Sequence, residues 1–147
     1  MKALVVYDTN HGNTQEIAEE IAHALGSSAS AVSVEKVKKN DLSGLDLFIV
    51  GSPVIGSQPT EKMAEFLDGL SKDQLKGTRA AAFDTRMKPF FFTNAINKIE
   101  SKLKNAGADV LEKEKFWVKG AEGPLLKDEL GRAKKWAGGL REKISGD

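Results

Sequence analysis

The stretch LVVYDTNHGNTQEIAEEIAHAL, residues 4–25, indicates the fold of the whole chain. Its apolar start, residues 4–7, is typical of a buried strand. Apolar residues spaced four apart between Ile17 and Leu25 then share one face of a helix. The polar loop at residues 8–14 leads into that helix, whose first amides lack internal partners and carry the positive end of the helix dipole. This strand, loop and helix therefore predict a binding site for an anion.

The loop offers hydrogen-bond donors but contains no Lys or Arg. Gly12 lets the backbone approach a ligand closely. Side-chain hydrogen bonds to a phosphate can come from Thr9, Asn10, Asn13 and Thr14. The loop lacks the G-x-x-x-x-G-K-[ST] pattern of a Walker P-loop. The alternative interpretation is an ordinary polar connection with an Asn-rich helix cap.

The hexapeptide Thr9-Asn10-His11-Gly12-Asn13-Thr14 closely resembles the phosphate loop of the flavodoxin family, [ST]-x-T-G-x-T. The resemblance implies that this loop holds the terminal phosphate of FMN. His11 stands where the family usually has Thr, and flavodoxin domains of A-type flavoproteins often carry a larger residue there. The order and spacing of the predicted strands and helices resemble those of the family over nearly the whole chain. The last strand lacks the insertion of long-chain flavodoxins, so the chain resembles the short-chain flavodoxins.

Composition narrows the class of protein. A chain of 147 residues with 40% hydrophobic residues fits one domain, residues 1–147, with a proper core. A net charge of +1 provides no basic or acidic block that would select nucleic acid or a membrane surface. The absence of Cys excludes disulfides, thiolate catalysis and Cys-ligated metal or iron–sulfur sites. Met1 and Lys2 lead directly into the first strand, so we expect a cytoplasmic protein.

Strand and helix patterns alternate along the rest of the chain. Further strands are predicted at residues 32–37, 46–51, 79–83 and 109–111, with 116–118 as a candidate continuation. Helices are predicted at residues 60–70, 96–103 and 126–144. Five strands alternating with helices favour an α/β fold, a doubly wound parallel sheet with both faces covered. The expected topology is flavodoxin-like, with strand order 2-1-3-4-5.

Ligands of such sheets bind beyond the carboxyl ends of the strands at the switch point, here between the first and third strands. Residues 52–59 and 84–92 must then line the site together with residues 8–14. The first of these two loops begins with Gly51-Ser52-Pro53-Val54-Ile55-Gly56, which resembles the G-[ST]-P turn of A-type flavoproteins and flavodoxin-like quinone reductases. The predicted cofactor contacts in it are Pro53, Val54, Ile55 and Gly56. They can contact a flavin face but cannot stack on it as the Trp of typical flavodoxins does. The alternative is a loop that only covers the sheet end.

The other loop departs most from the family, and its predicted cofactor contacts are Asp84, Thr85, Arg86 and Met87. Met87 or Phe90 can replace the usual aromatic contact to the ring. Arg86 near the pyrimidine edge would favour the anionic reduced flavin and raise its potential. Alternatively, Arg86 pairs with Asp84 and only shapes the loop. The three phenylalanines at residues 90–92 are expected to divide between core and helix packing.

The preferred interpretation is a flavodoxin-type electron-transfer protein that binds FMN and exchanges electrons with an unidentified redox partner protein. One alternative is a flavin-dependent oxidoreductase acting on a quinone- or porphyrinogen-like substrate, for which the missing aromatic sandwich leaves space. Another is a flavin-free binding module on the same fold. The histidines, His11 and His23, lack metal-ligand spacing, and no Ser-His-Asp arrangement can be argued. No chemical role is assigned to residues 116–124, and Trp117 and Trp136 are expected to serve in packing.

Overall fold

The computed structural model describes residues 1–88, 90 and 92–146. Its five parallel strands form one sheet in the order β2-β1-β3-β4-β5, which confirms the predicted fold class and topology. The strands are β1 (Ala3–Tyr7), β2 (Ala29–Ser33), β3 (Leu47–Pro53), β4 (Arg79–Met87) and β5 (Asp109–Val118). The helices are α1 (Asn13–Leu25), the short 3-10 helix η1 (Lys39–Leu42), α2 (Glu61–Asp68), α3 (Ala95–Asn105) and α4 (Glu129–Ser145).

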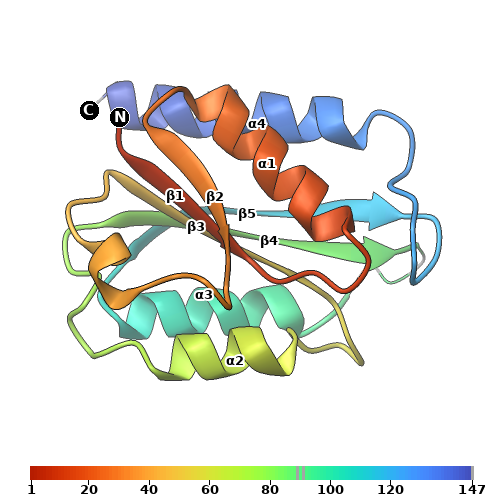
Figure 1. The fold of residues 1–147 in the computed structure, drawn as a ribbon, viewed down its shortest axis with the longest axis horizontal. Helices are drawn as coiled ribbons and strands as arrows, with labels where there is room; N and C mark the ends of the chain where they lie inside the picture. Colours follow the sequence, from red (N-terminus) through yellow and green to blue (C-terminus); the bar gives the residue numbers. More distant parts are fainter. Residues whose placement is uncertain (89, 91, 147) are drawn as a thin grey trace.

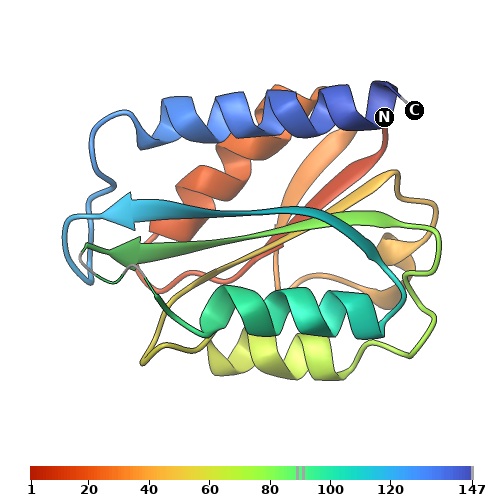
Figure 2. The same cartoon turned by 180° about the vertical axis from the view of Figure 1, so that it is seen from behind.

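Helices cover both faces of the sheet. Helices α1 and α4 lie on one face, and α2 and α3 lie on the other (Figures 1 and 2). Alternate residues of β1 enter the two resulting cores, with Val5 on the α1 and α4 side and Val6 on the α2 and α3 side. All five residues of β1 are buried. The strand is therefore continuously apolar rather than alternating, as expected for a strand buried on both faces.

Small residues let the centre of the sheet accept large rings. Gly51 in β3 has no side chain, and a Cβ at this position would overlap the Phe83 ring of β4. The Phe83 ring packs edge to face against Phe116 and Trp136, at centroid distances of 5.9 and 6.3 Å. This cluster ties β4 and β5 to α4. The expectation that Trp136 is a packing residue is confirmed.

The second strand differs from its prediction. Alternation at residues 32–37 predicted an edge strand there, but β2 spans Ala29–Ser33. Its small residues carry little strand signal, because Ala and Ser are weak strand formers and β2 is only partly buried. The alternation instead arises from a turn, in which the Lys36 amide donates to the Ser33 carbonyl while Val34 and Val37 pack on the core.

Two further boundaries also differ. Strand β4 continues to Met87, beyond its predicted end at residue 83. Helix α4 begins at Glu129, so Leu126 lies before it and bonds through its amide to the Trp117 carbonyl. Within the helix Leu130 is exposed rather than core-facing. The apolar residues before α4 therefore belong to the connection from β5.

Candidate functional site

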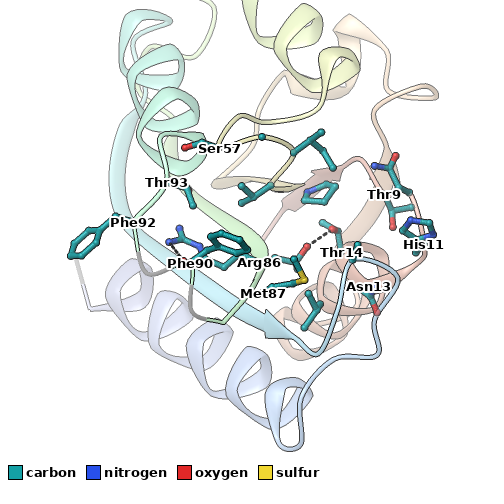
Figure 3. A pocket seen from close by; sticks show the side chains of 18 residues that line it. Thr9, His11, Asn13, Thr14, Ser57, Arg86, Met87, Phe90, Phe92 and Thr93 are labelled. Atoms are coloured by element: carbon teal, nitrogen blue, oxygen red, sulfur yellow. Dashed lines mark hydrogen bonds between the residues drawn. The ribbon is translucent and has the colours of Figure 1, made fainter.

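A cavity of about 480 Å³ lies beyond the carboxyl ends of β1, β3 and β4 (Figure 3). Its volume falls in the range typical of small-molecule sites. It brings together all the predicted site residues except Gly12 and Asp84. The predicted residues that line it are Thr9, Asn10, His11, Asn13, Thr14, Pro53, Val54, Ile55, Gly56, Thr85, Arg86 and Met87.

The loop between β1 and α1 is shaped by its own side chains. The Thr9 hydroxyl accepts from the Gly12 amide at 2.8 Å, and the Asp8 carboxylate accepts from the Thr9 amide at 2.9 Å. Gly12 has a left-handed φ of 92°, which favours glycine, and it stands at the N-cap of α1. None of the side chains that the structure describes caps this helix. Gly12 therefore turns the chain into α1 while leaving its first amides available to an anion.

Two buried hydroxyls join this loop to the far side of the cavity. The Oγ1 atoms of Thr14 and Thr85 lie 2.8 Å apart, which is a hydrogen bond between the start of α1 and the end of β4 (Figure 3, dashed line). Both residues line the cavity and both are buried. The loop is thus fixed against the central strands of the sheet rather than only against its own helix.

The segment after β5 also packs on this loop. A Cβ placed on Gly123 would lie 2.6 Å from Oδ1 of Asn13, and Gly123 has a left-handed φ of 100°, so glycine suits this close approach of the two segments. Val118 and Ala121 of the same region line the cavity. Residues 116–124, which had no role assigned from sequence, therefore form a wall of the site. Their repeated Gly and the Gly-Pro pair were the available signal for a close approach.

The turn after β3 forms a rigid apolar wall. Backbone bonds of 2.8 and 2.9 Å run both ways between Ile55 and Gln58, and the Val54 amide donates to the Thr85 carbonyl at 3.1 Å. The carbonyl and hydroxyl of Ser57 both accept from the Asn94 amide. These contacts hold the turn between β4 and the start of α3. A flat apolar group could rest on it without reorganising the loop.

Arg86 lies within β4, not in the following loop, and it is buried. Its Nε and Nη2 atoms donate to the two carboxylate oxygens of Asp84 at 2.8 and 2.6 Å, and Nη1 donates to the Phe90 carbonyl at 3.2 Å. Burial raises the pKa of Asp84, while the Arg86 guanidinium opposes that rise. Asp84 does not line the cavity. This is the geometry of the alternative interpretation, in which Arg86 pairs with Asp84 and anchors the loop.

Several residues that line the cavity were not singled out from the sequence, although Ser57 and Phe92 lie in the two loops that were expected to line it. They are Ser57, Phe92 and Thr93, together with the Val118 and Ala121 already described. Phe90 and Phe92 are 52% and 96% exposed, so the expectation that they pack in the core or on helices is wrong. Phe91 lies outside the described residues. Three adjacent phenylalanines do not show from sequence alone whether they pack in the core or lie at the edge of a cavity, because apolar side chains are found in both places.

Polar side chains line both ends of the cavity. Thr9, His11 and Asn13 lie at one end, and Ser57 and Thr93 lie at the other (Figure 3). The Thr93 hydroxyl oxygen is buried and has no hydrogen-bond partner among the described residues. A buried hydroxyl left unpaired is costly, so it marks a place where a ligand can accept or donate a hydrogen bond.

The described residues contain no group of three or more His, Asp or Glu that could hold a metal ion. His23 is exposed on α1, as expected, and His11 is exposed at the cavity. No helix in the described part of the chain is long and apolar enough to cross a membrane.

Comparison with known proteins supplies the family. The family model described as flavodoxin matches residues 5–136. A flavodoxin from Maridesulfovibrio salexigens is 27% identical over 97% of this chain and 99% of its own length. Oxidised flavodoxin 2 from Bacillus cereus is 25% identical, with a TM-score of 0.83 over 97% of this chain and 99% of that structure. Rubredoxin oxygen:oxidoreductase from Desulfovibrio gigas, 17% identical with a TM-score of 0.80, shares the fold over 99% of this chain but 36% of its own length.

The family model covers most of the chain, and the observed strand order is the one expected for the flavodoxin fold. The alternatives, a quinone- or porphyrinogen-type oxidoreductase and a flavin-free module, are not favoured. The chain belongs to the flavodoxin family, whose members bind FMN and carry electrons between redox partners.

Proposed function

We propose that this cavity is the FMN site and that residues 9–14 hold the FMN phosphate. The observation that carries the proposal is the meeting of an uncapped helix start, a hydroxyl-rich loop and an apolar turn in one cavity. Phosphate is an anion that accepts hydrogen bonds from amides and hydroxyls, which are the donors this loop supplies. Gly12 belongs to the proposal as the residue that shapes the loop, although it does not line the cavity.

The apolar residues that line the cavity fit a flavin ring. Pro53, Val54, Ile55 and Met87 offer apolar surface to a flat ring, and no carboxylate among the described residues lines the cavity. The unpartnered Thr93 hydroxyl offers a hydrogen bond to a polar ring edge. FMN supplies the one- and two-electron chemistry when it is bound, while the chain binds and orients it and keeps water from one side of the ring.

We also propose how Arg86 takes part. Its guanidinium is engaged by Asp84 and by the Phe90 carbonyl, so its charge is largely neutralised before any flavin binds. This geometry supports a role in holding the loop that carries Phe90 against the cavity. It gives less support to a direct clamp on the reduced flavin, and Asp84 enters the proposal only through Arg86.

A redox partner is proposed to dock over the apolar rim of the cavity. Ile55, Phe90 and Phe92 form this rim, and each is at least half exposed. Several of the charged residues that the sequence places around the cavity are buried or paired: Asp8 is buried, Lys62 pairs with Glu35, and Arg86 pairs with Asp84. Apolar contact rather than charge attraction would then hold the partner, which must present a complementary apolar surface around its own redox centre.

The phosphate assignment is tested by FMN titration of the flavin-free protein and its variants. Gly12→Val forces a β-branched residue into a left-handed conformation, so the loop should lose its shape and FMN affinity should fall. Ser30→Ala, on the exposed face of β2, is the control and should leave FMN affinity unchanged. Equal FMN affinity in wild type and Gly12→Val would remove the loop from the site.

The cytoplasmic location expected from the sequence stays a prediction. Fractionation of cells that produce the tagged protein would check it, with the protein expected in the fraction that contains cytoplasmic enzymes. Recovery with the membrane or secreted fraction would contradict the prediction.

A further inference from the structure

Thr85 contacts two loops of the site, the loop after β1 and the turn after β3. It pairs in register with Pro53 near the end of β4, and its carbonyl accepts the Val54 amide at 3.1 Å. Its hydroxyl bonds that of Thr14 at 2.8 Å, across 71 residues of sequence. Its side chain thus reaches the loop assigned to the phosphate, and its backbone reaches the loop assigned to the ring.

The two hydroxyls of the hydrogen bond between Thr14 and Thr85 can bind a phosphate in only one arrangement of donors and acceptors. Each Thr hydroxyl carries one proton and can accept through its lone pairs. A phosphate dianion can only accept hydrogen bonds. Thr14 can therefore bond to it only by donating its O–H hydrogen bond to a phosphate oxygen. Thr14 then has no proton left for Thr85, and the Thr85 hydroxyl must donate to Thr14. Both residues are buried, which leaves little water to replace either bond.

We propose that Thr85 is a positioning residue for phosphate binding, whose hydroxyl donates to Thr14 and thereby directs the Thr14 proton to the phosphate of FMN. The inference rests on the proposed function of the cavity and goes beyond it. Hydrogen bonds in such a chain polarise one another, so the Thr85 bond strengthens the Thr14 bond as well as orienting it. Thr85 lies on β4 and acts on the phosphate only through Thr14.

A competing role is possible because Thr85 also lines the cavity, where it could touch the flavin ring directly. Riboflavin separates the two roles, since it carries the same ring and lacks the phosphate. A residue that acts through Thr14 on the phosphate affects FMN affinity alone. A residue that touches the ring affects FMN and riboflavin equally.

The experiment measures the dissociation constants of FMN and riboflavin for wild type, Thr85→Val and Thr85→Ser. Thr85→Val keeps the β-branched shape and the backbone contact to Val54 while removing the hydroxyl. It should raise the FMN constant about 3- to 10-fold, the loss expected for one hydrogen bond, and leave the riboflavin constant within about twofold. Thr85→Ser restores the hydroxyl and should return FMN affinity to within about twofold of wild type.

A double-mutant cycle completes the test. In a Thr14→Val background, Thr85→Val should cause no further loss of FMN affinity, because its route to the phosphate is already gone. If Thr85→Val does not fold, Thr85→Ala carries the same predictions. An equal loss for FMN and riboflavin, an unchanged FMN constant, or additive losses in the cycle would each overturn the inference. Failure of the wild type to bind FMN would instead overturn the proposed function on which the inference rests.

Discussion

Replacing Arg86 with Met should be among the most destabilising single changes in this chain. Arg86→Met keeps much of the side-chain volume but leaves the Asp84 carboxylate fully buried without its two charged hydrogen bonds. Removing one partner of a buried ion pair costs about 3–5 kcal/mol, because the other charge stays desolvated. The urea midpoint of unfolding should therefore fall by about 1.5–2.5 M, given a denaturant slope of about 2 kcal/mol per molar.

The loss should depend on pH in a defined direction. Burial raises the pKa of Asp84 above its ordinary value of 3.8 even with Arg86 present, and losing the guanidinium removes the effect that opposes the rise. The folded variant then binds the Asp84 proton more tightly than the unfolded chain does. Its free energy of unfolding falls as pH rises from about 3.8 through the folded-state pKa. The deficit relative to wild type should therefore shrink toward acid pH.

The assay is urea unfolding of the flavin-free protein at several pH values. Lys62→Met is the matched control, because it breaks the exposed pair between Lys62 and Glu35 and should change the midpoint little. The double variant Asp84→Leu with Arg86→Met removes both charges and should recover most of the lost stability. A small loss in Arg86→Met, or a loss that grows toward acid pH, would refute this account of the buried pair.

Three other outcomes are expected. Thr14→Ala should weaken FMN binding by roughly 10- to 150-fold, the equivalent of a charged hydrogen bond of ~1.5–3 kcal/mol, and an unchanged titration would exclude a phosphate contact. Gly51→Ala should lower the free energy of unfolding by about 1–3 kcal/mol or prevent folding, since the new Cβ overlaps the Phe83 ring; unchanged thermal unfolding would contradict this. Phe92→Ser should slow electron exchange with a partner more than it weakens FMN binding, because the ring is almost fully exposed at the edge of the cavity, and that exchange should depend weakly on salt; a rate that falls steeply with added salt would count against the apolar rim.

Much of the fold could be predicted because buried strands and amphipathic helices leave strong periodic signals. The apolar start of the chain predicted β1, and the order of elements predicted the sheet that the structure shows. The position of β2 was predicted wrongly because its Ala and Ser residues carry no such periodic signal. The end of β4 was missed because the polar residues Asp84 and Arg86 suggested a loop. They are instead buried in the strand, where each neutralises the other.

The part of the candidate site that a single continuous segment forms could be predicted from the sequence. The contacts between segments far apart in the sequence could not. The loop at residues 9–14 could be recognised from its own residues, because the helix start and the loop donors are adjacent in sequence. The contact between Asn13 and Gly123 joins segments that only the folded sheet brings together. The hydrogen bond between Thr14 and Thr85 has the same origin, since a hydroxyl gives no sign in sequence of the partner it will find.

The account is tested most directly by an anaerobic redox titration of the protein after loading with FMN and gel filtration. It predicts that one FMN per chain stays with the protein and that its reduction potentials differ from those of free FMN, because the cavity surrounds the ring with protein groups in place of water. Reduction and reoxidation should be reversible, as electron carriage requires. FMN that elutes apart from the protein, or bound FMN with the potentials of free FMN, would contradict the account.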